Sequence, residues 1–334
     1  MHTLIKRSRW IVGAMTMVAS CWAMAQSDYP SRSITVVAPY SAGGDSDAAA
    51  RNFAQSASEA LKVPVVVLNK EGASGIIGSN YVISAPADGY TLLLARVGSQ
   101  GILPAITPSV TKYKWDDFTF IGMLELNPYG CVVHADSPYK TFGELVEAIK
   151  TKGTGLNYGT AGHLTSNDMG PRRLFQLLKL GSGQTPTQIP YKGTGDTVSS
   201  LLAKETHFSC GSIGPFLTQI KANKLRALII TTPERIPSLP DVPTARELGV
   251  PEMESVIGWS AIYGPPGMPE AVVKRLSDVM LQHVAKDPNW IKRTEQMGSI
   301  PFIKSPEQTR DFARKQHELY RSLGESLNII DAKK

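Results

Sequence analysis

Two short loops combine small residues with helix-capping side chains in a way that favours binding of an anion. The first, APYSAGGDSDAAAR, spans residues 38–51, where an apolar run ends at Pro39, two glycines follow, and a helical pattern begins. Small side chains let a ligand approach the backbone, and the free N–H groups of a helix N-terminus attract negative charge. Asp45 and Asp47 are good N-cap residues that would repel a phosphate dianion, and no Gly-Lys-Ser/Thr follows. A carboxylate, held partly through water, therefore suits this loop better than a phosphate; an ordinary capped turn is the alternative.

The second loop, LNYGTAGHLTSNDMGPRR, repeats this arrangement at residues 156–173. A strand runs to Tyr158, a turn of small residues follows, and hydroxyl and capping side chains lie at residues 165–168. Two such loops facing each other would hold one carboxylate between two helix N-termini. His163 lies at the loop tip. No nucleophile stands beside it, so we interpret it as a hydrogen-bond donor to the ligand, with an ordinary exposed histidine as the alternative.

A third glycine-containing stretch resembles a dinucleotide-binding fingerprint but lacks two of its features. Gly72, Gly75 and Gly78 follow a strand and open a helix, yet three polar residues precede the first glycine. The acidic residue expected at the end of the next strand is missing, because Asp88 precedes that strand instead. We interpret this stretch as structural and expect no cofactor. The motifs of serine hydrolases and zinc proteases are also absent, so we expect no catalytic residues and no metal site.

Strand-like and helix-like segments alternate along most of the chain. Apolar runs rich in Val and Leu at 33–40, 63–70 and 90–96 read as buried strands, and a second alternating series begins near Tyr129. This pattern is typical of parallel, doubly wound α/β sheets, and about 309 mature residues suggest two domains. We therefore expect an α/β fold of two lobes in a venus-flytrap arrangement, with doubly wound sheets in both lobes and the ligand in the cleft. The expected division is a signal peptide at 1–25, the first part of lobe 1 at 26–126, lobe 2 at 127–250 and a return to lobe 1 at 251–334.

The first 25 residues have the features of a secretory signal peptide. Three basic residues precede an uncharged apolar run that ends in AMA at 23–25, so we expect cleavage after Ala25 and a periplasmic location. VASC before Cys21 is a weaker match to a lipoprotein processing site and leaves lipid anchoring as the alternative. Loss of this leader lowers the net charge from +6 to +3. No basic block with interleaved aromatics is present, and we expect no nucleic-acid partner.

Two cysteines remain in the mature chain. Cys131 and Cys210 both lie in apolar runs and lack the spacing of metal ligands. Export makes a disulfide possible, but we favour two buried free thiols.

Five stretches of the chain resemble the substrate-binding proteins of tripartite tricarboxylate transporters, the Bug-type periplasmic receptors. They are YPSRSITVVAPYSAGGDSD, APADGYTLLLA, IPYKGTGDTVSSLLA, KLRALIITTPERIPSLPDVPTARELGVP and YGPPGMPEAVVKRL. The resemblance covers the mature chain nearly end to end. It implies a non-enzymatic, monomeric two-lobed receptor that delivers a carboxylate solute to membrane permease subunits. It also implies that one carboxylate binds at Tyr40, Ser41, Ala42, Gly43, Gly44, Asp45, Thr160, Ala161, Gly162, His163, Leu164, Thr165 and Ser166.

Three departures from the family pattern bear on the rest of the ligand. Arg96 stands where a small or polar loop is common, and His163 stands where Asn is common. The region SCGSIG, residues 209–214, lacks the acidic residue usual there. An amino-acid ligand such as aspartate is therefore disfavoured, because its ammonium would lack a counter-ion.

Arg96 follows a strand at the sheet edge where ligands bind, so we predict that it holds a second carboxylate bidentately. A surface salt bridge is the alternative. Tyr191 and Trp259 are predicted to flank a planar ring, with core packing as the alternative. The distal contacts are thus Arg96, Gly98, Ser99, Tyr191 and Trp259. The predicted ligand is a dicarboxylate, either aliphatic or aromatic as in terephthalate. A sensory receptor of the same fold and, less favoured, an exported enzyme are the other hypotheses.

Overall fold

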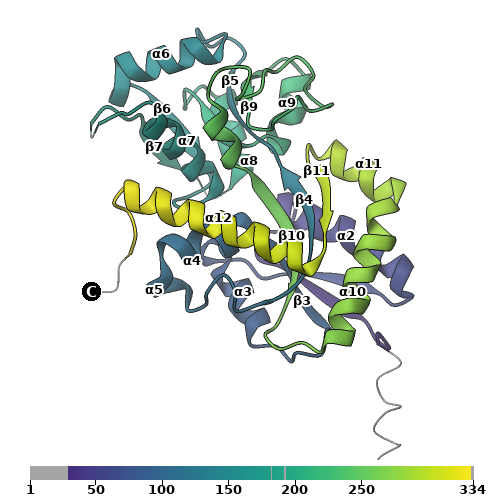
Figure 1. Cartoon of the computed structure of the whole chain (residues 1–334). Coiled ribbons are helices and arrows are strands. Elements are labelled where there is room, and N and C mark those ends of the chain that lie inside the picture. The colour runs from purple at the N-terminus through teal and green to yellow at the C-terminus, as the bar shows by residue number, and fades with distance from the viewer. Residues whose placement is uncertain (1–28, 182, 192, 332–334) are drawn as a thin grey trace, which may run out of the picture.

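The computed structural model describes residues 29–331 except 182 and 192, and it forms two lobes, one above the other in the view of Figure 1. The predicted signal peptide, with Cys21 and Ala25, lies outside the described residues. Among the described residues, no helix combines the length and apolar character needed to cross a membrane.

Eleven strands form the sheets of the described chain. They are β1 (Ile34–Ala38), β2 (Val65–Asn69), β3 (Thr91–Arg96), β4 (Thr119–Asn127), β5 (Tyr129–His134), β6 (Asn157–Thr160), β7 (Thr187–Pro190), β8 (Ser209–Ser212), β9 (Leu225–Ile230), β10 (Gly258–Gly264) and β11 (Ile300–Lys304). Lobe 1 contains the six-stranded sheet β11-β4-β10-β3-β1-β2. Strand β1 is parallel to β2 and β3, whereas β10 is antiparallel to β3 and β4.

Helices surround these sheets. They are α2 (Asp45–Leu61), α3 (Ile76–Ile83), α4 (Leu103–Ile106), α5 (Pro108–Thr111), α6 (Phe142–Lys152), α7 (Ser166–Leu177), α8 (Thr194–Leu202), α9 (Leu217–Lys221), α10 (Glu270–Gln282), α11 (Pro288–Gln296) and α12 (Pro306–Ser326). Short helical turns lie at η1 (Ala73–Gly75), η2 (Val97–Ile102, a π-helix), η3 (Gly153–Gly155), η4 (Gly214–Phe216), η5 (Pro251–Ser255) and η6 (Val284–Lys286).

The apolar runs of β1 and β3 are continuous because both faces of the lobe 1 sheet are covered. Alternate side chains of a strand point to opposite faces. Leu92 and Leu94 pack with α2, α10 and α11, whereas Leu93 and Ala95 pack with α3, α4 and α12. This two-sided burial is what the Val- and Leu-rich runs predicted for β1 and β3. The prediction of a buried strand at 63–70 was wrong, because β2 lies at the edge of the sheet and exposes Val66 and Leu68.

Lobe 2 contains the sheet β8-β5-β9 and the parallel pair β6-β7. Strand β5 is antiparallel to both of its neighbours. The alternation of strands and helices had predicted a parallel sheet, and for β8-β5-β9 this prediction was wrong. A parallel bridge between Tyr158 and Phe208 links the two small sheets.

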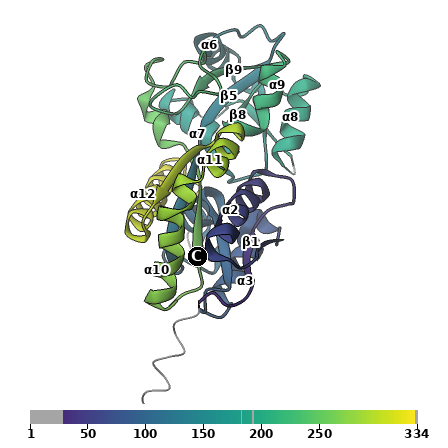
Figure 2. The same cartoon turned by 90° about the vertical axis from the view of Figure 1, so that its right-hand side faces the viewer.

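The chain passes between the lobe 1 sheet and the lobe 2 sheets twice. The first passage joins β4 to β5 between Asn127 and Tyr129, and the second joins β9 to β10 between Ile230 and Gly258. Helix α12 runs along the junction (Figures 1 and 2), and a hydrogen bond from Gln176 to Ser326 ties it to α7 of lobe 2. We retain the exact lobe boundaries, at residues 127 and 250, as a proposal.

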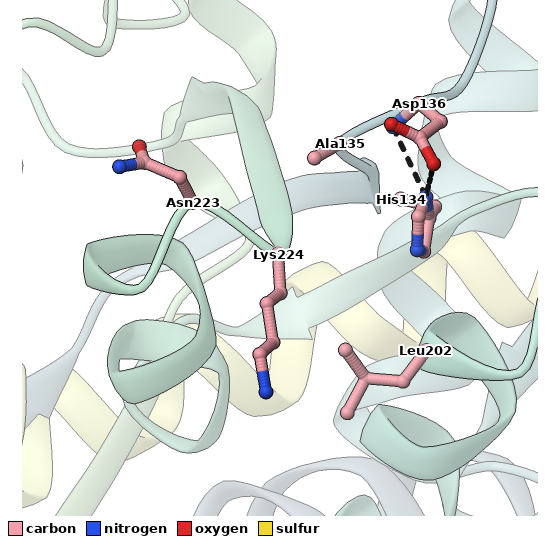
Figure 3. Close-up of a pocket in the computed structure, with 6 residues that line it drawn as sticks. All are labelled: His134, Ala135, Asp136, Leu202, Asn223 and Lys224. Carbon is pink, nitrogen blue, oxygen red and sulfur yellow. Dashed lines mark hydrogen bonds and ion pairs between the residues drawn. The ribbon is translucent and has the colours of Figure 1, made fainter.

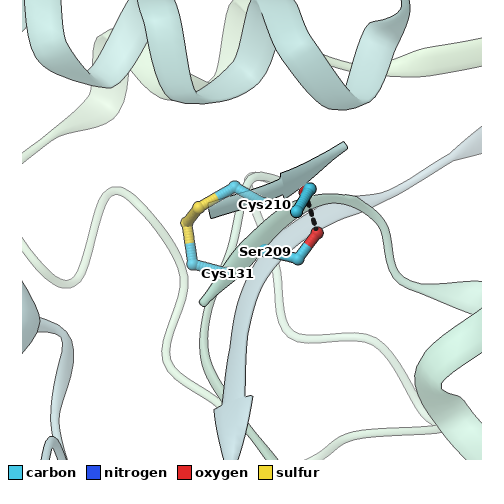
Figure 4. Close-up of a disulfide and its surroundings, with 4 residues drawn as sticks. Cys131, Ser209 and Cys210 are labelled. Atoms are coloured by element: carbon cyan, nitrogen blue, oxygen red, sulfur yellow. Dashed lines mark hydrogen bonds between the residues drawn. A yellow bond between two sulfur atoms is a disulfide. The ribbon is translucent and has the colours of Figure 1, made fainter. Parts of the chain in front are cut away.

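Cys131 and Cys210 form a disulfide between β5 and β8 (Figure 4). Our preference for two free thiols was therefore wrong. The two residues face each other directly in the antiparallel register. They are 79 residues apart in sequence, and only the strand pairing brings them together.

Candidate functional site

The first predicted loop, Tyr40–Gly44, connects β1 to the start of α2. The helix begins at Asp45 with Gly44 as its N-cap, so Asp45 and Asp47 lie in the first turn rather than at the cap position that the sequence predicted. Gly44 supplies no side-chain cap, which leaves amide groups of the first turn available to a ligand. Gly43 has a φ of 79°, a conformation that glycine adopts without strain.

The second predicted loop, Thr160–Ser166, has the same construction. Helix α7 begins at Ser166 with Thr165 as an N-cap whose side chain makes no cap hydrogen bond. Gly162 and Leu164 both have positive φ values, which turn the chain toward the helix. His163 is exposed at the tip of this loop.

Both loops are held by an aspartate in the third position of the following helix. Asp47 Oδ2 accepts from the Gly43 amide at 3.0 Å and from Arg51 Nε at 2.9 Å. Asp168 accepts in the same way from the Leu164 amide at 2.9 Å and from Arg172 Nε at 2.8 Å. Each aspartate therefore binds the amide four residues before it and the arginine four residues after it.

This shared arrangement gives Arg172 a structural contact within its own helix. Asp168 is fully buried, and Asp47 is 5% exposed. Burial opposes ionisation of Asp47, but hydrogen bonds from Arg51, Gly43 and Asn69 outweigh it and lower its pKa. The sequence signal for this arrangement was a spacing, Asp-x-x-x-Arg, that occurs after both loops.

Arg96 ends β3, the strand next to β1, and its side chain is 12% exposed. Its Nη1 donates to Ser260 Oγ at 2.7 Å. The guanidinium also lies 3.9 Å from Asp45 Oδ2 and 3.9 Å from Glu125 Oε1. Arg96 is thus a buried cation between two carboxyl groups and not a member of a surface salt bridge.

A polar network around Glu125 is part of this site and was missed in the sequence. Glu125 Oε1 accepts from Ser260 Oγ and from Asn127 Nδ2, each at 3.0 Å, and Asn127 also donates to Ser299 at 2.8 Å. Burial raises the pKa of Glu125, although Arg96 and these hydrogen bonds offset part of the effect. Gly122, Glu125 and Asn127 interrupt the apolar pattern of β4, so the sequence did not predict a strand at 119–127.

A cavity of about 160 Å³ lies between the two lobes beside this network. Lobe 1 contributes Gly43, Gly44, Asp45, Ala48, Glu125, Asn127, Met297 and Ser299, and lobe 2 contributes Ser212, Gly214 and Pro215. Among the predicted loop residues, Gly43, Gly44 and Asp45 line the cavity. Asp45 and Glu125 also supply the negative charge that we had considered absent, so an ammonium group would not lack a counter-ion here.

The second loop contacts lobe 1, but none of its residues, Thr160–Ser166, lines this cavity. Leu164 and Met169 pack against the lobe 1 core cluster that contains Val97 and Ile102 of η2. Gly98 in η2 lies against Tyr40, since a Cβ there would come within 2.8 Å of the Tyr40 hydroxyl. Ser99 is buried and its hydroxyl donates to Gln100.

None of the five predicted distal contacts lines this cavity, although Arg96 lies beside Asp45 and Glu125, which do. Trp259 is fully buried and packs edge-on against Phe312, so the core-packing alternative describes it. The Tyr191 hydroxyl lies 3.4 Å from Glu205 Oε2 near the protein surface, and its backbone amide donates to Thr160. The prediction that they flank a planar ring has no support from these positions.

Several buried polar atoms close to the lobe junction have no hydrogen-bond partner among the described residues. They include Asn127 Oδ1, Tyr129 Oη, Asn167 Nδ2 and Tyr320 Oη. The charges of Arg96 and Asp45 both influence the pKa of Tyr129, which burial raises, so this hydroxyl lies near the polar network. Buried polar groups are nearly always paired, and these atoms therefore indicate a place where a ligand or water would bind.

A larger hollow of about 420 Å³ lies in lobe 2, away from the cleft (Figure 3). It is lined by His134, Ala135, Asp136, Leu202, Asn223 and Lys224. His134 is at the opposite end of β5 from the lobe junction, and Asp136 pairs with Lys204 at 3.0 Å. This hollow is open and shares no residue with the predicted site.

Two α/β lobes joined by two chain passages, with a polar cavity between them, define the class of two-lobed periplasmic binding proteins. The family model "Tripartite tricarboxylate transporter family receptor" matches residues 49–329. The chain belongs to this family, as the sequence resemblance predicted.

Individual relatives agree with this assignment. A UPF0065 protein of Agrobacterium vitis, encoded in the TAR-I ttuE-ttuC' intergenic region, is 36% identical over 295 residues, which cover 88% of this chain and 83% of the relative. The structure of the periplasmic binding protein BugD is 30% identical with a TM-score of 0.80, covering 90% of this chain and 99% of BugD. MatC from Rhodopseudomonas palustris with bound malate is 27% identical with a TM-score of 0.79, covering 89% of this chain and 100% of MatC. The predicted two-lobed fold is confirmed.

Proposed function

We propose that this protein is a monomeric, non-enzymatic periplasmic receptor that captures a small carboxylate between its lobes and delivers it to a tripartite tricarboxylate permease. The observation that carries the proposal is the shared construction of the loops Tyr40–Gly44 and Thr160–Ser166. Each presents a helix N-terminus without a side-chain cap, and each is fixed by a buried aspartate that pairs with an arginine of the same helix. Such N-termini bind carboxylates through their free amides.

We further propose that the ligand is a dicarboxylate whose second carboxylate binds Arg96. Among the described residues, the guanidinium donates only one direct hydrogen bond, to Ser260, which leaves N–H groups for a ligand. A planar guanidinium binds a carboxylate through two parallel hydrogen bonds. Malate bound to MatC is consistent with this class. Because Trp259 and Tyr191 lie away from the cavity, an aliphatic ligand is favoured over an aromatic one such as terephthalate.

A thermal-shift screen tests this proposal. Succinate, malate, adipate and terephthalate are compared with the monocarboxylates butyrate and benzoate, on the wild type, on Arg96→Ala and on Arg314→Ala. We expect at least one dicarboxylate to raise Tm more than its monocarboxylate analogue, and Arg96→Ala to remove that difference. Arg314 forms an exposed pair with Glu318 on α12 and serves as the control, for which wild-type behaviour is expected.

Two results would contradict the proposal. Equal shifts with mono- and dicarboxylates, or an unchanged dicarboxylate shift in Arg96→Ala, would refute a second anchor at Arg96. A bacterial strain that lacks the receptor tests what the protein does after it has bound its ligand. Lost uptake of the carboxylate supports delivery to a permease, whereas normal uptake with a lost transcriptional response supports the sensory alternative.

We also propose that the leader is removed after Ala25, so that the mature chain begins at Gln26. This proposal rests on the basic, apolar and small-residue segments of the sequence. N-terminal sequencing of the protein from the periplasmic fraction distinguishes this start from a lipid-modified Cys21.

A further inference from the structure

Glu125 is a charged side chain buried where the two lobes meet. It lies near the end of β4, two residues before the strand ends at Asn127, and 3% of its surface is exposed. It lines the interlobe cavity together with Ser212 of lobe 2. Burial of a carboxylate costs free energy unless the group is paired or neutralised, so its surroundings decide its charge.

The two oxygens of Glu125 have different surroundings. Oε1 accepts hydrogen bonds from Ser260 and Asn127, which are themselves fixed by Arg96 and Ser299. Oε2 receives no hydrogen bond from the described residues, and it is not among the polar atoms sealed from solvent. Since Glu125 lines the cavity, Oε2 is the oxygen that is free to meet a ligand there.

The charges around this carboxyl are unbalanced. Arg96 on β3 is the one cation, and Asp45 on α2 the one other anion, among the groups that shift the pKa of Glu125. Both carboxyl groups lie 3.9 Å from guanidinium nitrogens of Arg96. The other neighbours, from β4, β10 and the segment before β11, are the neutral Asn127, Ser260 and Ser299. With both carboxyl groups ionised the site carries a charge of −1, which opposes entry of a dianion.

We propose that Glu125 binds the distal carboxylate of the ligand as a neutral acid, after taking up one proton from solvent when the ligand binds. This inference rests on the proposed function as a dicarboxylate receptor. The proton resides on Oε2 and is donated in a hydrogen bond to the ligand, while Oε1 keeps its two donors as a carbonyl oxygen would. Arg96 supplies the charged contact to the same carboxylate. The site and its dianionic ligand then carry one negative charge fewer.

Proton uptake gives the affinity a defined pH dependence. The liganded protein holds one proton more than the free protein, so the affinity falls as the pH rises. The decrease reaches tenfold per pH unit where a full proton is taken up, and it disappears at pH values where Glu125 is already protonated without ligand. Burial raises the pKa of this group above that of an ordinary glutamate, so the pH dependence lies at higher pH than it would for an exposed glutamate.

Isothermal titration calorimetry of the full mature protein counts this proton directly. Succinate, malate and terephthalate are titrated between pH 6 and 9 in buffers with different ionisation enthalpies. At pH 7 and above these probes are dianions, so the count reports the protein. We expect uptake approaching one proton per ligand within this range. Binding with no uptake at any pH would overturn the inference and leave the carboxylate receptor intact, whereas no binding of any carboxylate would remove both.

The substitution Glu125→Gln assigns the proton to this residue. Its amide accepts at one atom and donates at the other, as the neutral acid would. We expect Glu125→Gln to fold with an unchanged Tm, and to bind the dicarboxylate with no proton uptake and an affinity that no longer depends on pH. Uptake should persist in His163→Asn, which removes the imidazole at the tip of the second loop. Uptake that persists in Glu125→Gln, or that is lost in His163→Asn, would overturn the assignment.

An amino-acid ligand is the competing explanation for a carboxyl in this cavity. L-aspartate and L-glutamate are therefore titrated in parallel. Tight binding of either one without proton uptake, weakened at least tenfold in Glu125→Gln, would show that ionised Glu125 serves as counter-ion to an ammonium. That result would overturn the proposal. Weak or absent binding of both amino acids supports the protonated form.

Discussion

At the scale of single residues, the two buried aspartates explain how both loops keep their shape without a ligand. Asp47 and Asp168 each connect a loop amide to an arginine one turn along the helix. Hydrogen bonds to ionised groups contribute about 1.5–3 kcal/mol each. The ligand therefore meets loops whose amides are already oriented, which lowers the entropic cost of binding.

Asp168→Asn tests this positioning role. The variant keeps the size of the side chain but loses its charge, and we expect the free energy of unfolding in urea to fall by about 1.5–3 kcal/mol. Carboxylate affinity should fall as well, because the Leu164 amide is no longer fixed. Asp278→Asn is the matched control, since Asp278 forms an exposed pair with Lys274 that contributes about 1 kcal/mol or less. If Asp168→Asn is destabilised but binds carboxylate with wild-type affinity, Asp168 stabilises α7 without positioning the loop for the ligand, and the positioning role is refuted.

The sequence predicted both loops and Arg96 as site residues because small residues, caps and a strand-terminal arginine are local signals. Of these residues, the structure places Gly43, Gly44 and Asp45 in the wall of the interlobe cavity. Glu125 and Ser260 gave no such signal, since each lies within a strand and becomes part of the site only when β4 and β10 pair. Trp259 was predicted as a ligand contact for the opposite reason: an aromatic residue near a lobe passage looks the same in sequence whether it faces a cavity or the core.

At the scale of secondary-structure elements, strand pairing in lobe 2 accounts for the main difference from expectation. Apolar runs predicted β5, β8 and β9 as strands, but the runs do not encode direction. The antiparallel register that places Cys131 opposite Cys210 is a contact across 79 residues, and spacing alone carries no information about it. The sequence analysis did not predict strands β4 and β11. Gly122 and Glu125 interrupt the apolar pattern of β4, and Pro301 interrupts that of β11.

The disulfide between β5 and β8 should contribute measurably to stability. Closing a loop of about 80 residues lowers the entropy of the unfolded chain, which corresponds to about 4 kcal/mol in the chain-entropy model. We expect the double variant Cys131→Ser/Cys210→Ser to lose stability of this order in urea unfolding. Dithiothreitol should destabilise the wild type by a similar amount and leave the double variant unchanged. Equal stability of the oxidised and reduced wild type would refute a stabilising role.

At the scale of the whole molecule, residues from both lobes line one cavity, so we expect ligand binding and lobe closure to be coupled. A ligand that touches both lobes binds the closed state preferentially and increases its population. The two passages between sheets, near Asn127 and between Ile230 and Gly258, are the places where the chain would bend.

Small-angle X-ray scattering of the purified protein measures this closure. We expect the radius of gyration to decrease on addition of a saturating dicarboxylate identified in the thermal-shift screen. Arg96→Ala at the same ligand concentration is the control and should remain at the ligand-free value. An unchanged radius in the saturated wild type would mean that the lobes adopt the closed arrangement before binding.

During synthesis the chain emerges with its N-terminus first. The order of strands in the lobe 1 sheet then limits when each lobe can fold. Strand β4 lies between β10 and β11, so both of its neighbours come from the last quarter of the chain. Lobe 2 has all of its strands once Ile230 has emerged, whereas the lobe 1 sheet must wait for Lys304. A sheet that needs its C-terminal strands cannot close early. The complete lobe 1 sheet therefore cannot form until nearly the whole chain has emerged, and an incompletely folded chain is the form that can pass through a membrane channel during export.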